Sequence, residues 1–149
     1  AIPDSILCTP GELSSEEWEQ VRRHPDLGFQ LLAGSGSRLL ELAASIALTH
    51  HERLNGTGYP RGLSGEEIPL EGRIAAVADV FDAVTSERIY QRALGPEEAR
   101  AILAAGRGTL FDPVVLDAFE AARADVEAAR RGVPAGELAP AQVARRPGS

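Results

Sequence analysis

The sequence predicts an all-α protein, a helical bundle of about six helices. Apolar residues recur with a period near 3.6 in every stretch long enough to judge, as expected when each helix buries one face. No stretch alternates apolar and polar residues as a half-buried strand does, and the chain contains no internal repeat. Proline and glycine punctuate the periodic stretches and divide them into separate helices. The predicted helices span residues 15–23, 25–33, 38–51, 70–85, 96–105 and 113–130.

The first two predicted helices meet at a proline. Ser14 and Glu17 have the spacing of a capping box, so the first helix begins at about residue 15. Pro25 disfavours helical geometry in the residue before it but suits the first turn of a new helix. His24 is therefore expected at the junction between the two helices.

The third predicted helix ends in two adjacent histidines, His50 and His51. Leucine and alanine residues recur at helical spacing before them, and His50 is in line with the face expected to be buried. The 18 residues that follow, 52–69, contain several glycines and two prolines and show no period. A loop of this length is uncommon in a compact domain and often functional.

Two carboxylates fall within the apolar pattern of the fourth predicted helix. Asp79 and Asp82 lie among residues expected to face the core. An unpaired buried carboxylate is costly, so something must neutralise these side chains. A metal ion would do so, but an ion pair between Asp79 and Arg73 or Arg88 would serve equally, and Asp82 also suits a local hydrogen bond.

Two more helices and a tail complete the chain. Pro96 suits a first helical turn, and Gly106 ends the helix that begins there. Beyond the last predicted helix the chain is rich in proline and small residues and loses its periodicity. We expect one helical domain over residues 1–131 and a flexible tail over 132–149.

Composition excludes several classes of protein. The 149 residues carry a formal net charge of −7, which disfavours a protein that holds long nucleic acid on a broad positive surface. All 15 basic residues are arginine, so a small anionic ligand would require a metal ion or a few local arginines. A single cysteine, no apolar run of membrane-spanning length and no leader predict a cytoplasmic protein without a membrane span.

The candidate metal ligands are His24, His50, His51, Asp79 and Asp82. Imidazole is the commonest side-chain ligand of transition metals, and carboxylate oxygen accompanies it in mixed sites. Structural roles account for the same residues, because paired histidines also favour the negative end of a helix dipole and His24 also suits a hydrogen bond to a backbone carbonyl. The residues alone leave both interpretations open.

Several separated motifs, in this order, resemble those of the HD-GYP domains, which are helical metal-dependent phosphohydrolases of the HD superfamily. The resemblance spans nearly the whole chain up to about residue 120. It rests on Ile2-Pro3-Asp4 with Pro10-Gly11, His24-Pro25, His50-His51-Glu52 through Gly58-Tyr59-Pro60, Ile68 to Ile74, Val77 to Ala83, and Gly108 to Pro113.

The resemblance implies hydrolysis of cyclic di-GMP, a bacterial second messenger, to its linear dinucleotide or to GMP. The centre it implies holds divalent metal ions, iron or manganese, with His24, His50 and His51 grouped mainly around one ion and Asp79 on its neighbour. An upstream sensory domain or other signalling proteins are the implied partners.

The same resemblance assigns the substrate-binding residues. Arg88 matches a position that holds a phosphate of the substrate, while Gly58, Tyr59 and Pro60 match the loop that names the family and helps to form the cleft. We therefore expect Tyr59 and Arg88 to border one open cleft that also holds the histidine pair.

Further ligands of the family, a His-Asp pair with a lysine and another histidine, are expected before Ala1. With only the ligands present here, we expect the chain to bind at most about one metal ion and to hydrolyse cyclic di-GMP slowly. The alternative is a non-catalytic module in bacterial signalling, which binds a nucleotide or a partner protein through the loop of residues 58–60.

Overall fold

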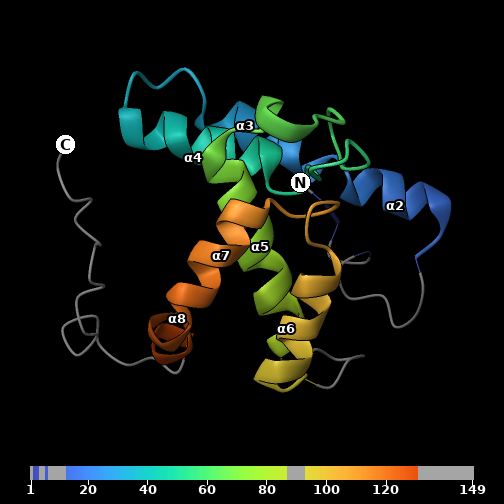
Figure 1. The fold of residues 1–149 in the computed structure, drawn as a ribbon. Helices are drawn as coiled ribbons and strands as arrows, with labels where there is room; N and C mark the ends of the chain where they lie inside the picture. Colours follow the sequence, from blue (N-terminus) through green and yellow to red (C-terminus); the bar gives the residue numbers. More distant parts are fainter. Residues whose placement is uncertain (1, 4–5, 7–12, 87–92, 131–149) are drawn as a thin grey trace, which may run out of the picture. The chain divides into compact units, whose positions relative to one another are not determined.

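The computed structural model describes residues 2–3, 6, 13–86 and 93–130, and this part of the chain is helical (Figure 1). It contains seven α-helices and one short 3-10 helix, and within it only isolated bridges, no strands, are found. The predicted all-α class is confirmed. The helices are α2 (Ser15–Val21), α3 (His24–Leu32), α4 (Arg38–Thr49), η1 (Gly65–Glu67), α5 (Leu70–Thr85), α6 (Pro96–Ala105), α7 (Pro113–Ala121) and α8 (Arg123–Arg130).

The single helix predicted over residues 113–130 is wrong. The chain turns at Ala122, so that α7 ends and α8 begins on either side of it. Neither proline nor glycine marks this break, and alanine is the best helix former, so no residue type there predicts it. The chain forms two compact units, residues 1–116 and 117–149, and all the histidines lie in the first unit.

The first unit begins with the predicted cap and junction. Ser14 and Glu17 form a capping box at the start of α2, with the Glu17 amide donating to Ser14 Oγ at 3.2 Å and the Ser14 amide to Glu17 Oε2 at 2.8 Å. Two residues separate the end of α2 from His24, and Pro25 occupies the first turn of α3. His24 therefore opens α3 at the helix junction that the sequence predicts.

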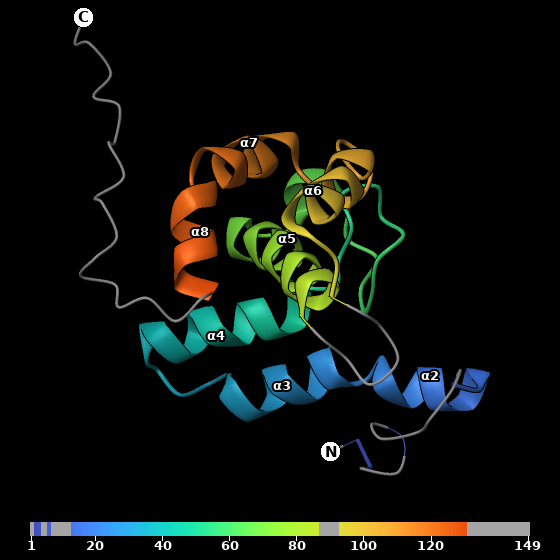
Figure 2. The same cartoon turned by 90° about the horizontal axis from the view of Figure 1, so that it is seen from below.

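Helices α3 and α4 lie side by side, and α5 packs against α4 (Figures 1 and 2). A Cβ on Gly28 would lie 3.1 Å from the Cβ of Ala47, so the absent side chain allows α3 and α4 to approach closely. A Cβ on Gly72 would collide with the Thr49 side chain, so α5 meets the end of α4 in the same way. The end of α4 therefore lies against Gly72 of α5, and Asp79 follows Gly72 about two helical turns later on α5.

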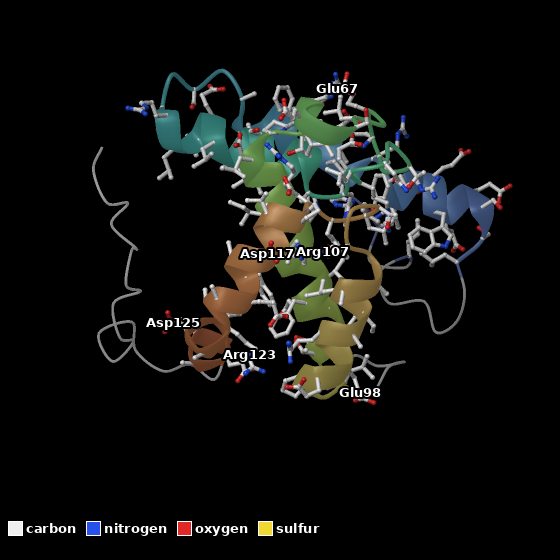
Figure 3. The ribbon with its side chains drawn as sticks, viewed as in Figure 1. Glu67, Glu98, Arg107, Asp117, Arg123 and Asp125 are labelled. Carbon is white, nitrogen blue, oxygen red and sulfur yellow. The ribbon has the colours of Figure 1, made fainter. Side chains whose placement is uncertain are left out.

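The core of the first unit lies between α5, α6 and the segment that leads into α7. Val77, Leu103 and Ile68 are almost fully buried, and Phe111 joins them. Glu98 lies near the start of α6 (Figure 3). Its carboxylate accepts a hydrogen bond from the Gly95 amide at 2.9 Å, which closes the first turn. No helix in the described ranges is long and apolar enough to span a membrane.

Burial differs from the prediction on two helices. Leu39 of α4 is 74% exposed and Ile74 of α5 is 51% exposed, whereas Ala44 is fully buried. The buried faces of α4 and α5 are therefore narrower than the apolar pattern. Small residues such as Gly72 lie at the close helix contacts, while Val77 and Phe81 of α5 are buried as predicted. Asp79 is also exposed, with 46% of its side-chain surface accessible, so the expectation of a buried carboxylate that needs a counter-charge is wrong.

Candidate metal centre

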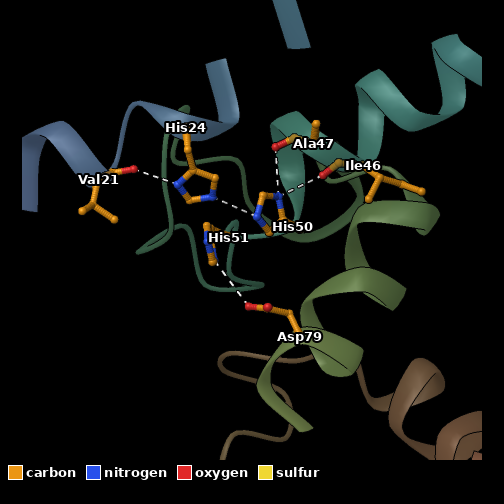
Figure 4. A network of polar contacts seen from close by, with 7 residues as sticks. All are labelled: Val21, His24, Ile46, Ala47, His50, His51 and Asp79. Atoms are coloured by element: carbon orange, nitrogen blue, oxygen red, sulfur yellow. Dashed lines mark hydrogen bonds and ion pairs between the residues drawn. The ribbon is translucent and has the colours of Figure 1, made fainter. Parts of the chain in front are cut away.

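The three histidines of the chain meet at the junction of α3, α4 and the following loop (Figure 4). His24 opens α3, His50 is the C-cap residue of α4, and His51 follows it. The ring centroids lie 5.1 Å apart for His24 and His50, 4.8 Å for His24 and His51, and 4.1 Å for His50 and His51. Because α4 ends at His50, the side chains of His50 and His51 both point toward His24 although they are adjacent in the sequence.

Backbone carbonyls fix the orientation of two of these rings. His24 Nδ1 lies 2.7 Å from the Val21 carbonyl oxygen, and His50 Nδ1 lies 2.9 Å from that of Ala47. A carbonyl only accepts, so each Nδ1 carries the hydrogen, and in a neutral imidazole the opposite Nε2 is then an unprotonated acceptor. The hydrogen bond of His24 to a carbonyl, considered as an alternative to metal binding, instead prepares the ring for it.

The two Nε2 atoms face each other at 3.1 Å. When both are acceptors no hydrogen lies between them, and two lone pairs at this distance repel unless a proton or another cation is shared. Nitrogen ligands bind a metal such as zinc at about 2.0–2.1 Å, so two that share one ion lie within about 4 Å of each other. The distance between the Nε2 atoms thus fits a shared metal ion.

His51 completes the cluster and connects it to α5. One ligand atom from each of the three histidines lies within 4.8 Å of the others. Burial first, and then electrostatic interactions with His50, His24 and Arg53, lower the pKa of His51 to about 4. At pH 7 the ring is therefore neutral, and one of its two nitrogens has a lone pair that can bind a metal. On its other side, His51 Nδ1 lies 3.8 Å from Asp79 Oδ2 (Figure 4). The donor set, three imidazoles with one carboxylate nearby, suits a divalent transition metal.

A buried carboxylate holds the loop that follows the histidines. Glu52 is 2% exposed, and its two oxygens accept hydrogen bonds from the backbone amides of Arg61 at 2.7 Å and Leu63 at 3.0 Å. The Tyr59 amide donates to the His51 carbonyl at 3.2 Å. The loop therefore folds back onto the segment from which it starts, and its conformation is coupled to that of the histidine pair.

Gly58 and Tyr59 occupy distinct places in this loop. A Cβ on Gly58 would overlap the backbone of residues 51–53, so only glycine allows the loop to pack so closely. The Tyr59 ring lies 4.7 Å from the His51 ring at an interplanar angle of 31° and forms one wall of the cluster. Burial raises the pKa of Tyr59, which keeps the phenol neutral.

The Arg22 guanidinium lies over the Tyr59 ring. Its central carbon lies 5.5 Å from the centroid of the Tyr59 ring, and the residue is exposed at the end of α2. Both Arg22 and Arg53 act electrostatically on Tyr59. The histidine cluster therefore has positive charge beside it, as expected for a site that accepts an anion.

Comparison with known proteins agrees with this geometry. The family model described as HD domain matches residues 1–115. The chain belongs to the HD domain family. The resemblance predicted from the motifs is thereby confirmed, and the histidine cluster lies inside the matched HD domain.

Two sequence relatives of this HD domain are phosphodiesterases by name. The cyclic di-GMP phosphodiesterase response regulator RpfG of Xanthomonas campestris is 54% identical over 127 residues, which cover 85% of this chain and 34% of the relative. The 3'3'-cGAMP-specific phosphodiesterase 2 of Vibrio cholerae is 44% identical and matches 78% of this chain and 22% of the relative. The chain thus spans about a third of the first relative and less of the second.

A solved structure has a similar fold. The cyclic GMP-AMP-specific phosphodiesterase of Vibrio cholerae matches 93% of this chain and 37% of its own chain, with a TM-score of 0.55. Sequence identity is 24%, so this similarity concerns the fold alone.

The HD domain structure places most of the predicted site residues in one region. His24, His50 and His51 lie together with Asp79 beside them, and Gly58, Tyr59 and Pro60 lie in the loop over them. Arg88 lies outside the described residues, so its place in the cleft stays a prediction. Of the structural alternatives, Arg73 pairs with Asp112 at 2.6 Å instead of Asp79, and Asp82 accepts a local hydrogen bond from Ser86 at 3.1 Å.

Sequence reasoning missed two residues at this site. Glu52 follows the histidine pair directly, but nothing in the sequence shows that its carboxylate turns inward to bind the loop. Arg22 lies two residues before His24, on the last turn of a helix whose expected role was only to lead to the junction. Only its closeness in the sequence to the candidate ligand His24 could have indicated that Arg22 belongs to the site.

Proposed function

We propose that this chain is a metal-dependent phosphodiesterase that hydrolyses cyclic di-GMP to the linear dinucleotide or GMP. The observation that carries the proposal is the pair of Nε2 atoms of His24 and His50, which face each other at 3.1 Å while each Nδ1 donates to a carbonyl. His51 and Asp79 lie next to this pair and are proposed to complete the ligand set.

The protein's own residues would bind and orient the substrate. The imidazoles offer nitrogen ligands, and Asp79 offers a carboxylate at an accessible edge of the cluster. Arg22 and Arg53 offset the negative charge of a phosphodiester, and the Tyr59 ring limits access of water on one side. A bound divalent ion would supply Lewis acidity and a more acidic water, so that water adds to phosphorus as one P–O ester bond breaks.

The names of the sequence relatives support the substrate class. One relative acts on cyclic di-GMP and another on 3'3'-cGAMP, and both are cyclic dinucleotides. We propose cyclic di-GMP as the substrate because the relative of higher identity is named for it. The proposed metal is iron or manganese, the proposed compartment is the cytoplasm, and a sensory domain or other signalling proteins are the proposed partners.

The experiment is a hydrolysis assay on the 149-residue chain with added iron(II) or manganese(II), followed by chromatography of the products. Cyclic di-GMP and 3'3'-cGAMP are supplied separately. The proposal expects linear dinucleotide or GMP from cyclic di-GMP, at a slow rate, and no product from the His50→Gln variant. Binding of cyclic di-GMP without any turnover would instead favour the non-catalytic module, and faster turnover of 3'3'-cGAMP would correct the substrate.

A further inference from the structure

A hollow on α2 adjoins the candidate metal centre, and of the residues that line it only Arg22 has a part in the proposed chemistry. It has a volume of about 340 Å³ and is lined by Ser15, Trp18, Glu19 and Arg22. We call these four residues the α2 hollow. Arg22 belongs both to the hollow and to the surroundings of the metal centre, because its guanidinium lies over the Tyr59 ring, which also contacts the rings of His51 and His24.

The residues of the α2 hollow offer three different kinds of contact. Trp18 is 48% exposed, so an indole face on the surface is available for stacking. Arg22 is exposed and, among the described residues, its one recorded partner is the Tyr59 ring. Glu19 is exposed on the same helix and has no ion pair in the described part of the chain. A large aromatic ring, a guanidinium and a carboxylate therefore share one hollow.

We infer that the α2 hollow binds one guanosine phosphate unit of the substrate, with phosphate on Arg22, the base against Trp18 and the guanine edge at Glu19. A guanidinium offers planar donors that match phosphate oxygens. Guanine carries an N1–H and an exocyclic amine on one edge, and a carboxylate accepts from both. Adenine lacks this pair of donors, so Glu19 would favour guanine over adenine.

The inference deepens the proposed function and rests on it. A cyclic dinucleotide carries two phosphates in one ring, so that when one phosphate reaches the histidine cluster the other remains near it. Arg22 and His51 both lie against the Tyr59 ring, with the guanidinium carbon 5.5 Å and the His51 ring 4.7 Å from its centroid, so Arg22 is near enough to the cluster to meet the second phosphate. An arginine that only stacked on the half-buried Tyr59 ring would stabilise the fold slightly and would not affect ligand binding.

The test measures binding of cyclic di-GMP to the manganese-loaded 149-residue chain by calorimetry and by fluorescence. Trp18 is the only tryptophan in the chain, so quenching of its emission reports a base in the hollow. Arg22→Gln is expected to weaken binding about tenfold or more, as loss of hydrogen bonds to a charged group does. Glu19→Gln is expected to reduce the preference for cyclic di-GMP over cyclic di-AMP.

Two neighbours on the same helix provide matched controls. Arg23→Gln and Glu16→Gln make the same charge changes on exposed residues that do not line the α2 hollow, and they are expected to bind as the unchanged protein does. Metal content is measured for each variant, because a loss of bound metal would show that the substitution has disturbed the nearby His24.

The outcomes separate the inference from the proposed function. Binding that quenches Trp18 and is weakened by Arg22→Gln but not by Arg23→Gln supports the inference. If cyclic di-GMP binds equally to both variants, or binds without quenching, the inference is overturned and the proposed function stands. No binding of cyclic di-GMP by the unchanged, metal-loaded chain would refute both.

Discussion

Replacing Glu52 by glutamine should destabilise the loop over the histidine cluster. Both oxygens of this buried carboxylate accept backbone amides, at 2.7 Å from Arg61 and 3.0 Å from Leu63. Glutamine keeps one acceptor and places an NH₂ group against the other amide. One charge-assisted hydrogen bond is lost and one buried donor is left unpaired, while the neutral side chain costs less to bury, so the net loss is about 2–3 kcal/mol.

Thermal unfolding with and without manganese measures this effect. For a chain of this length the loss corresponds to a fall in Tm of roughly 5–10 °C. Glu66→Gln is the matched control, because Glu66 lies in the same loop but is exposed, and its replacement should change stability by less than about 0.5 kcal/mol. Equal Tm values for the two variants would show that the Glu52 carboxylate does not hold the loop.

Three further changes test the site and its surroundings. Gly58→Ala should displace the loop and lower metal affinity, because a Cβ there overlaps the preceding backbone, whereas Gly95→Ala, with its nearest contact at 3.4 Å, should leave metal binding measured by calorimetry unchanged. Burial tends to raise the pKa of Asp112, but hydrogen bonds from the Val114 amide and Arg73 outweigh it, so the pKa is lowered. The ionised carboxylate therefore stabilises the fold above the unfolded pKa of 3.8, and this stabilisation is lost as the pH falls from there through the lower pKa of the folded state. In urea unfolding at falling pH, Asp112→Asn should lose less of its free energy of unfolding than the unchanged protein does. Manganese at about 100 times its Kd should stabilise the chain by about 2.7 kcal/mol, and His50→Gln should abolish this gain in a thermal shift assay.

The sequence predicted the helices well where punctuation was strong. Pro25, the capping box at Ser14 and the glycine-rich loop each marked a boundary that the structure places within about two residues. The break at Ala122 had no such mark. A helix boundary can therefore be predicted from the sequence only where proline, glycine or a capping side chain marks it.

Burial was harder to predict than the helices themselves. The apolar pattern of α5 suggested that Asp79 is buried, whereas the residues that approach α4 most closely are small ones such as Gly72. On α5, Ile74 is 51% exposed, while Val77 and Phe81 are buried in the core. Asp79 lies beside His51 because α5 approaches the end of α4 closely. The sequence-based argument grouped Asp79 with the histidines, as the structure does, but its premise that the carboxylate is buried is wrong.

Part of the candidate site could be predicted from the sequence. Adjacent histidines at a helix end and a histidine before a proline are visible in the chain, and the family motifs brought them together. The carbonyls that orient His24 and His50 depend on how the two helix ends meet, and the inward turn of Glu52 depends on the path of the loop. Such contacts join residues through backbone geometry, which residue types alone do not specify.

X-ray absorption of the metal-loaded chain tests the central claim most directly, with zinc as a spectroscopic probe. The account predicts about one ion per chain, with three imidazole nitrogens at about 2.0–2.1 Å, and loss of that imidazole signal in His50→Gln. A ligand shell of oxygen alone, or a spectrum unchanged by His50→Gln, would contradict the assignment of His24, His50 and His51 as the metal ligands.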